Sequence, residues 1–271
     1  MASPVWFREL LKHLFPARFL LARATRVPLL GRLIDLALFN GDDIYYLPDN
    51  RVVEINATLP PPGDTVLPSA VAEHFVKTAS RRFIMHSCLC RDAAKCEDYP
   101  TNLGCVFLGE STTRINPAFG REATVEEALA HLEKCREAGL VHLVGRNKLD
   151  AVWMNAWPKE RLMTICHCCP CCCLWRVLPV IDQEVGRKVQ RLPGVSVRVG
   201  DECVGCGVCE RDACFVDAIS VVEGRAVISD QCRGCGRCAT LCPQQAIEVV
   251  FEDPDAVDQV VGRLSRLVDL G

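Results

Sequence analysis

The 19 cysteines of this 271-residue chain constrain it most, because they are grouped and part of their pattern is repeated. One run of three, with two residues between successive cysteines, occurs again 29 residues later: Cys203, Cys206 and Cys209, then Cys232, Cys235 and Cys238. Small residues recur with it: Gly205, Gly207, Ala218 and Ile219, then Gly234, Gly236, Ala246 and Ile247. An internal repeat of this kind predicts two structurally similar halves.

The composition favours metal binding over a disulfide framework. The number of cysteines is odd, and the first residues lack the apolar segment and cleavage site of a secretory signal. Cysteines in such tight groups are also poorly placed to link separate parts of a fold. We therefore expect them to bind metal in a reducing cytoplasm. The net charge of −3 argues against a nucleic-acid partner, which usually requires a basic surface.

The spacing within each run suits a cubane iron–sulfur cluster. Such a cluster is bound by four thiolates, and a chain with two residues between cysteines can curl around it. Glycines between the cysteines allow a tight loop and let backbone N–H groups approach the cluster. Two zinc sites are the alternative, because paired cysteines also bind zinc. The triple runs and their repetition favour clusters.

Residues 195–252 resemble bacterial-type two-cluster ferredoxins, on the strength of the two runs and of Pro243 after Cys242. The resemblance implies a first 4Fe–4S cluster held by Cys203, Cys206, Cys209 and Cys242, and a second held by Cys232, Cys235, Cys238 and Cys214. The first run departs from the family pattern, because four residues rather than three precede Cys214 and Phe215 stands in place of the usual proline. Over its full length the chain is similar to uncharacterised ferredoxin-domain proteins of anaerobic microbes.

The residues next to the cysteines predict different reduction potentials for the two clusters. Arg233 and Arg237 flank the cysteines of the second run, where the first run has Val204 and Val208. Positive charge near an anionic cluster favours its reduced form. We therefore expect the cluster of the second run to have the higher potential.

A second set of cysteines lies in the middle of the chain: Cys88, Cys90, Cys96 and Cys105, then Cys166, Cys168, Cys169, Cys171, Cys172 and Cys173. We expect a third metal site there. Three interpretations remain open: a third iron–sulfur cluster, a zinc site that includes His167, and cysteines that are redox-active thiols or serve only in packing. Our ligand hypothesis is Cys90, Cys96, Cys168 and Cys169, with Cys88, Cys105 and Cys166 as alternatives. Arg91 is either a positive charge beside this site or a surface arginine.

The expected fold class is α+β: a ferredoxin-type module of two small β-hairpins and two short helices, joined to a mixed α/β cysteine-rich region. The predicted segments are a helical, basic region at 1–62, a cysteine-rich domain at 63–175, a linking helix at 176–194, the two-cluster module at 195–252 and a C-terminal helix at 253–271, packed on that module. Thr124 and Glu127 predict a capping box that starts a helix with Cys135 on its buried face. A strand is expected at 140–144.

The first 40 residues combine apolar helical faces with several arginines. Such helices pack on the protein's own body, on a partner subunit or on a membrane surface. No segment is long and apolar enough for a membrane span. We expect a cytoplasmic protein, either free or peripheral to the membrane.

The function that these patterns favour is electron transfer to a redox partner protein. An oxidoreductase with its catalytic site at the middle cysteines is the main alternative, and a thiol-based redox sensor or assembly protein is another. No dinucleotide fingerprint or phosphate-binding loop is present. No catalytic residue is predicted, and His86, His131 and His142 are interpreted as isolated structural residues.

Overall fold

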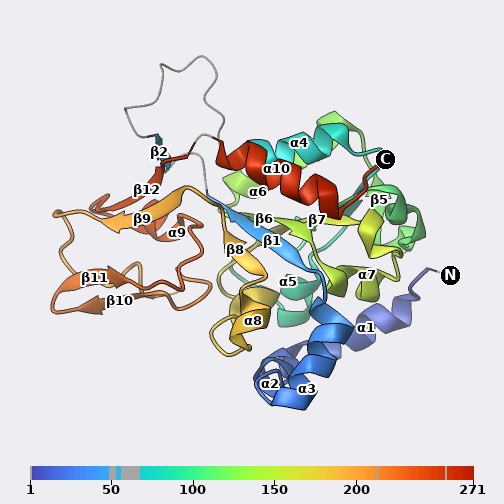
Figure 1. Ribbon diagram of the computed structural model, residues 1–271, viewed down its shortest axis with the longest axis horizontal. Helices are drawn as coiled ribbons and strands as arrows, with labels where there is room; N and C mark the ends of the chain where they lie inside the picture. Colours follow the sequence, from blue (N-terminus) through green and yellow to red (C-terminus); the bar gives the residue numbers. More distant parts are fainter. Residues whose placement is uncertain (1, 49–52, 56–67, 212, 254) are drawn as a thin grey trace.

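A computed structural model describes residues 2–48, 53–55, 68–211, 213–253 and 255–271. The main body is a seven-stranded mixed sheet with helices on both faces (Figure 1). The C-terminal module, residues 195–252, extends from one side of this body and has small sheets of its own. The expected mixed class, α+β with a small C-terminal module, is confirmed. The proline-rich boundary expected near residue 62 lies outside the described residues.

The strands of the large sheet come from widely separated parts of the chain. Their order is β5 (Gly120–Glu122), β3 (Arg82–Met85), β4 (Val106–Leu108), β7 (Met163–Cys168), β6 (Val141–Arg146), β1 (Asp43–Leu47) and β8 (Val189–Arg191). Neighbours are antiparallel, except that β1 and β8 are parallel. The sheet therefore includes strands from the predicted N-terminal, middle and linking segments.

One face of the sheet is covered by α4 (Ala70–Thr78), α6 (Val125–Glu137) and α10 (Ala256–Leu267). The largest apolar core lies beneath these helices.

The predicted capping box of α6 is confirmed, because Thr124 Oγ1 accepts from the Glu127 N–H and the Glu127 carboxylate accepts from the Thr124 N–H. The strand expected at 140–144 is β6. The expected packing of α10 on the C-terminal module is confirmed only in part: α10 lies against α4 and β6, and its buried residues share the largest core with Val195, Val249 and Phe251 of the module.

The other face carries α5 (Leu89–Ala94) and α7 (Lys148–Met154), with the N-terminal helices α1 (Val5–Leu14), α2 (Arg18–Ala24) and α3 (Pro28–Ile34) beside them. Short 3-10 or π segments occur at Phe15–Ala17, Asp35–Phe39, Glu110–Arg114, Pro117–Phe119 and Lys159–Arg161. The helical character of the first 40 residues is confirmed. Asp92 of α5 anchors α1 through ion pairs of 3.2 Å to Arg8 and 3.3 Å to Lys12.

The predicted linking helix at 176–194 is wrong. The segment contains a 3-10 turn (Leu174–Val177), the short helix α8 (Gln183–Gly186) and strand β8. Pro179 interrupts a helical course because it lacks a backbone N–H, and Asp182 restarts the chain as the cap of α8 by accepting from the Glu184 N–H at 2.9 Å. Leu178, Ile181, Val185 and Val189, which have helical spacing in the sequence, are buried all the same in the core on this face of the sheet.

The C-terminal module contains β9 (Val195–Val199), β10 (Ile219–Val222), β11 (Arg225–Ile228), α9 (Arg237–Leu241) and β12 (Ile247–Phe251). β10 and β11 form a hairpin, whereas β9 and β12 pair as the first and last strands of the module. β2 (Val53–Ile55) adds to β12 in parallel. Of the two hairpins and two short helices expected, the described residues contain one hairpin, one pair of end strands and α9. Within the described ranges, no helix has the length and apolar character needed to cross a membrane.

Candidate metal centres

The glycines of the two cysteine runs in the C-terminal module have matching backbone conformations. The glycines between the cysteines have φ values of 64° at Gly205 and 76° at Gly207, and of 66° at Gly234 and 76° at Gly236. Only glycine adopts this left-handed region without strain. At Gly205 a side chain is also excluded by space, because a Cβ atom would lie 2.2 Å from the Gly224 carbonyl oxygen. The repeat seen in the sequence is therefore a structural repeat.

Backbone N–H groups point at the sulfur atoms in both halves. The Ala218 N–H donates to Cys214 Sγ at 3.2 Å, and the Ala246 N–H donates to Cys242 Sγ at 3.4 Å. In each case the donor lies four residues after the cysteine. The extra residue before Cys214 therefore leaves its local geometry equivalent to that of Cys242. Such N–H groups stabilise negative charge on sulfur, which is the form that binds iron.

The structure gathers the eight cysteines of the module around two cavities. Cys203, Cys206, Cys209 and Cys242 line the first, and Cys214, Cys232, Cys235 and Cys238 line the second. These are the two crossed sets that the ferredoxin resemblance implies, and their role as ligands stays a prediction. Burial raises the pKa of Cys235 to about 12. A buried thiol of this kind becomes a thiolate when a bound metal supplies the compensating positive charge.

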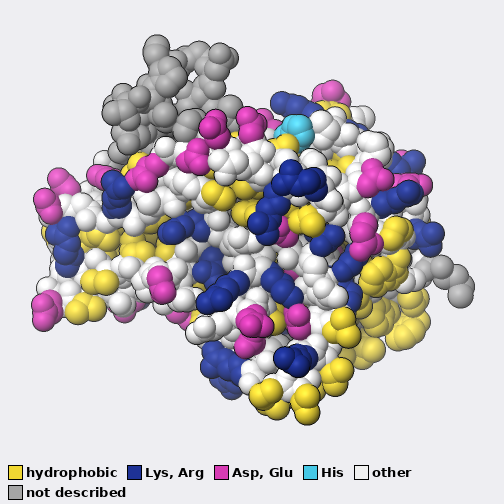
Figure 2. All heavy atoms as spheres, in the orientation of Figure 1, with side chains coloured by type: hydrophobic (Ala, Val, Ile, Leu, Met, Phe, Trp, Pro, Cys, Tyr) yellow, Lys and Arg dark blue, Asp and Glu magenta, His cyan; other side chains and the backbone are white. Residues whose placement is uncertain are grey.

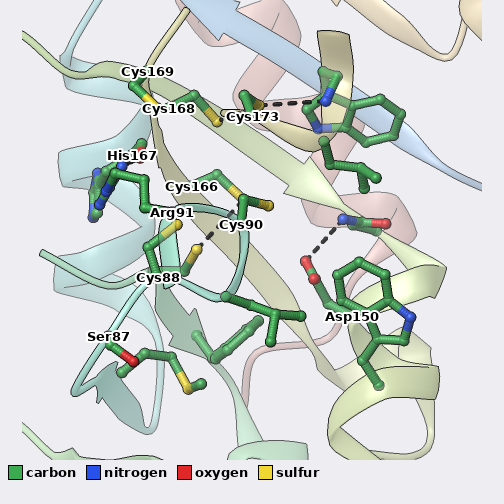
Figure 3. A pocket seen from close by; sticks show the side chains of 18 of the residues that line it. Ser87, Cys88, Cys90, Arg91, Asp150, Cys166, His167, Cys168, Cys169 and Cys173 are labelled. Carbon is green, nitrogen blue, oxygen red and sulfur yellow. Dashed lines mark hydrogen bonds between the residues drawn. The ribbon is translucent and has the colours of Figure 1, made fainter. Parts of the chain in front are cut away.

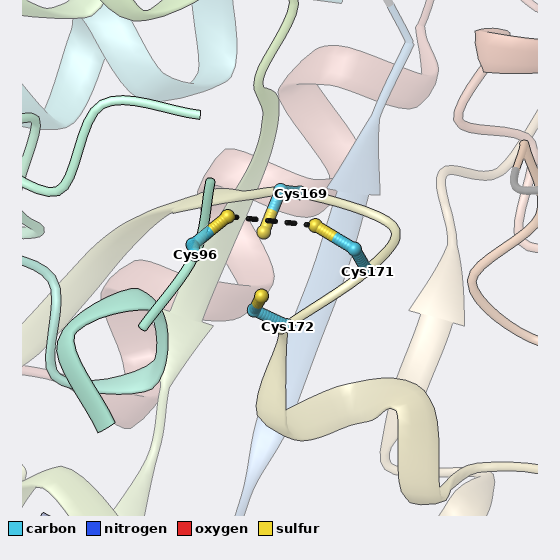
Figure 4. Close-up of side chains that lie close together, drawn as sticks. All are labelled: Cys96, Cys169, Cys171 and Cys172. Atoms are coloured by element: carbon cyan, nitrogen blue, oxygen red, sulfur yellow. Dashed lines mark hydrogen bonds between the residues drawn. The ribbon is translucent and has the colours of Figure 1, made fainter. Parts of the chain in front are cut away.

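The cysteines of the middle region separate into two groups rather than one. Four of them form the Cys96 tetrad, in which all sulfur atoms lie within 4.8 Å of one another: Cys96, Cys169, Cys171 and Cys172 (Figure 4). The Sγ atoms of Cys96 and Cys171 are 3.6 Å apart. The tetrad joins the loop after α5 to the loop after β7, and Cys171 is exposed.

The other six, which we call the pocket cysteines, line a cavity: Cys88, Cys90, Cys105, Cys166, Cys168 and Cys173 (Figure 3). Cys169 of the tetrad also lines this cavity, so the two groups adjoin there. The ligand hypothesis for the middle region thus combines members of two groups. The structure brings Cys96 and Cys169 together in the tetrad, and it places Cys90 and Cys168 among the pocket cysteines.

Arg91 is fully buried beside both groups, so its interpretation as a surface arginine is wrong. Its guanidinium donates to three carbonyl oxygens, those of Pro100 at 2.9 Å, His167 at 2.6 Å and Leu103. Burial acts to lower the pKa of Arg91, but the charges of nearby thiols, led by Cys88 and Cys105, raise it above its ordinary value. Negative charge on these sulfurs would therefore stabilise the Arg91 cation.

A cluster of histidines was not foreseen in the sequence. His142 and His167 face each other across β6 and β7, with their Nδ1 atoms 2.7 Å apart. His131 and Cys135, one helical turn apart on α6, complete a group in which one atom each of His131, Cys135 and His167 lies within 4.8 Å of the others. Burial lowers the pKa of His167 well below its ordinary value, so the ring is neutral. In the sequence, only the four-residue spacing of His131 and Cys135 indicates part of this cluster, because it places both side chains on one face of a helix.

The C-terminal module contacts residues that pack beside the tetrad. Arg237, which follows Gly236 in the second run, donates to the Gly139 carbonyl oxygen at 2.8 Å and to the Tyr99 hydroxyl. Burial raises the pKa of Tyr99, the charge of Arg237 acts to lower it, and the charges of Cys171 and Cys169 act to raise it. Arg237 and Tyr99 therefore lie between the second cavity and the tetrad.

Comparison with known proteins identifies part of this architecture. Residues 211–252 match the family model described as the LdpA Fe-S cluster-binding domain. The match includes the whole second run with Cys214 and Cys242. No curated protein and no solved structure matches the chain. The chain thus contains an iron–sulfur cluster-binding domain, and this domain together with the cysteine groups indicates an iron–sulfur protein.

Proposed function

We propose that this protein is an electron carrier with two 4Fe–4S clusters in its C-terminal module. The first cluster is bound by the cysteines around the first cavity and the second by those around the second cavity. The observation that carries this proposal is the duplicated arrangement of four cysteines, left-handed glycines and N–H···S bonds. Paired clusters at short range provide a path for single electrons, one cluster being oxidised as the next is reduced.

The Cys96 tetrad is proposed as a separate metal centre for a single ion. With metal–sulfur bonds of about 2.3 Å, the sulfurs around a tetrahedral ion are roughly 3.8 Å apart, and Cys96 and Cys171 are separated by 3.6 Å. Zinc and iron both accept four thiolates in this geometry. Iron there would extend the electron path through Arg237 and Tyr99, whereas zinc would hold the two loops together.

Metal analysis of the anaerobically purified protein tests both assignments. The two clusters of the module require about eight irons and eight acid-labile sulfides per chain, with EPR signals that appear on reduction. The double substitution Cys96→Ser/Cys171→Ser is expected to remove one further ion, zinc or iron, and no sulfide. Fewer than eight irons in the unaltered protein would refute the two-cluster carrier. Loss of sulfide in the double variant would mean that the tetrad binds a cluster.

An oxidoreductase is the second candidate, because the cavity lined by the pocket cysteines also has Asn147, Asp150 and Trp153 in its wall. Burial raises the pKa of Asp150 to about 6, and its carboxylate accepts a hydrogen bond of 2.9 Å from Asn147. A small molecule reduced there would change the spectrum of the reduced protein on addition, which a simple carrier would not show.

We further propose that helices α1–α3 place the carrier on an anionic membrane surface. Eleven of the 15 large apolar side chains that are exposed in the described residues lie on these helices or next to α3: Val5, Trp6, Leu10, Leu14, Leu20, Leu21, Val27, Leu29, Leu30, Leu33 and Leu36. Figure 2 shows the corresponding apolar surface at the N-terminal end of the molecule. Arg23, Arg26 and Arg32 are exposed among them. Apolar faces with arginines suit the boundary between acyl chains and negatively charged headgroups.

Vesicle flotation tests this location. The full chain is expected to float with vesicles that contain phosphatidylglycerol and to float less with phosphatidylcholine alone. Leu29→Glu/Leu33→Glu should abolish flotation without unfolding the protein, because these side chains are 79% and 65% exposed. The matched control is Val222→Glu/Val227→Glu in the β10–β11 hairpin, which should float normally. Absence of flotation would refute the proposal, and self-association by the same helices would assign this face to a second copy of the chain.

A further inference from the structure

The pocket cysteines lie on four separate stretches of chain that the large sheet brings together. Cys166 and Cys168 are alternate residues of β7 and therefore point to the same face of the sheet. Cys88 and Cys90 begin α5, Cys105 directly precedes β4, and Cys173 follows the loop of the tetrad. Figure 3 shows the side chains of five of them converging: Cys88, Cys90, Cys166, Cys168 and Cys173.

The sulfur atoms are close but unbonded. Cys105 Sγ is 3.8 Å from Cys166 Sγ, and Cys173 Sγ is 3.1 Å from Cys168 Sγ. A disulfide requires about 2.05 Å. The cavity that the six cysteines line measures about 50 Å³, whereas a single water needs about 10–15 Å³. The space therefore suits a group larger than one ion or one water.

The charges around this cavity favour an anionic occupant. Arg91 is fully buried, and its three hydrogen bonds go to neutral carbonyl oxygens, which do not cancel its charge. A buried cation without a counter-charge is costly. Arg18 of α2 is a second cation within electrostatic reach of Cys90 and Cys173. Thiolates that hold an anionic cluster would supply the missing negative charge.

An apolar cluster connects this cavity to the C-terminal module. Tyr46 of β1 packs in the same core as Cys168 and Cys173, with Cys235 at its edge. Tyr46 is fully buried, and its hydroxyl has no hydrogen-bond partner in the described part of the chain. Its ring centroid is 5.6 Å from that of Phe215. Tyr46 therefore lies between the pocket cysteines and the second cavity.

We infer that the pocket cysteines bind an additional iron–sulfur cluster, separate from the tetrad and reached from the second cluster through Tyr46. Four of the six sulfurs suffice as ligands of a four-iron cluster. One electron leaves the second cluster of the module, which is oxidised, and reduces the pocket cluster. This inference rests on the proposed function, because the electron donor is the second C-terminal cluster. The binding site of the pocket cluster, however, contains none of the C-terminal cysteines.

Matched triple substitutions test this inference in the full chain, purified anaerobically. Cys166→Ser/Cys168→Ser/Cys173→Ser leaves only three pocket cysteines and is expected to lose about four irons and four sulfides. Cys96→Ser/Cys171→Ser/Cys172→Ser, which removes the same number of thiols from the tetrad, is expected to keep that sulfide. The EPR signals of the two C-terminal clusters should persist in both variants, which shows that the module is intact.

Two results would overturn the inference. One is an unaltered protein with about eight irons and eight sulfides, the content of the C-terminal module alone; this measurement needs no variant and does not depend on how the substitutions fold. The other is a pocket variant with undiminished iron and sulfide. Neither result would contradict the proposed two-cluster carrier. The carrier itself would be refuted if the reduced, unaltered protein showed no EPR signals from the C-terminal clusters.

Discussion

Replacing Cys235 by alanine should remove the second cluster of the C-terminal module and cut the electron path to the middle region. Cys235 lines the second cavity and lies at the edge of the core that contains Tyr46. Without its thiolate one iron loses its ligand, and we expect a loss of about four irons per chain. The first cluster should still be reduced, but it should no longer pass electrons to the middle centres, which are those of the Cys96 tetrad and the pocket cysteines. Iron analysis and EPR after stepwise reduction measure both effects.

The internal repeat offers a matched control, because Cys206 occupies the position in the first run that Cys235 occupies in the second. Cys206→Ala should lose the same amount of iron while the middle centres remain reducible. Each variant also retains a single C-terminal cluster whose midpoint can be titrated alone. The cluster left in Cys206→Ala should have the higher midpoint, because Arg233 lies in the wall of its cavity. Equal effects of the two variants on the middle centres would contradict the proposed path.

The sequence predicted the features whose causes are local. The left-handed glycines 205, 207, 234 and 236 follow from the run itself, since a chain curling around a cluster needs positive φ at these places. The capping box at Thr124 is likewise a contact between neighbours in the chain. The 176–194 segment shows the limit of periodicity: its apolar spacing suits a helix, but Pro179 and the cap at Asp182 divide it.

The division of the middle cysteines could not be predicted, because it depends on where β7 ends. Cys166 and Cys168 lie within the strand and share the pocket face, whereas Cys169 comes after the last strand residue and turns into the tetrad. A strand one residue longer or shorter would assign them differently. The histidine cluster depends in the same way on the register of β6 and β7, which pairs His142 with His167.

Replacing Arg91 by glutamine should lower the stability of the middle region by on the order of 3 kcal/mol or more, since each hydrogen bond to a charged group contributes about 1.5–3 kcal/mol. The guanidinium joins three stretches of chain through the carbonyl oxygens of Pro100, Leu103 and His167. Glutamine cannot reach all three, and the buried carbonyl groups left unpaired add to the cost. Urea unfolding followed by the fluorescence of Trp153 and Trp175, which line the pocket, reports on this region directly.

The charge and the hydrogen bonds of Arg91 can be separated with a second substitution. Arg91→Gln removes the positive charge and should also lower the iron content of the middle region. Arg91→Lys keeps the charge but loses the planar guanidinium, so it should retain the iron content and only part of the stability. Arg81→Gln is the control, because Arg81 forms an exposed ion pair with Glu122 and such pairs contribute about 0–1 kcal/mol. If Arg91→Gln matched this control in both stability and iron content, Arg91 would be neither a structural link nor the counter-charge of an anionic cluster. If lysine restored neither property, the hydrogen-bonding geometry rather than the charge would be what the site requires.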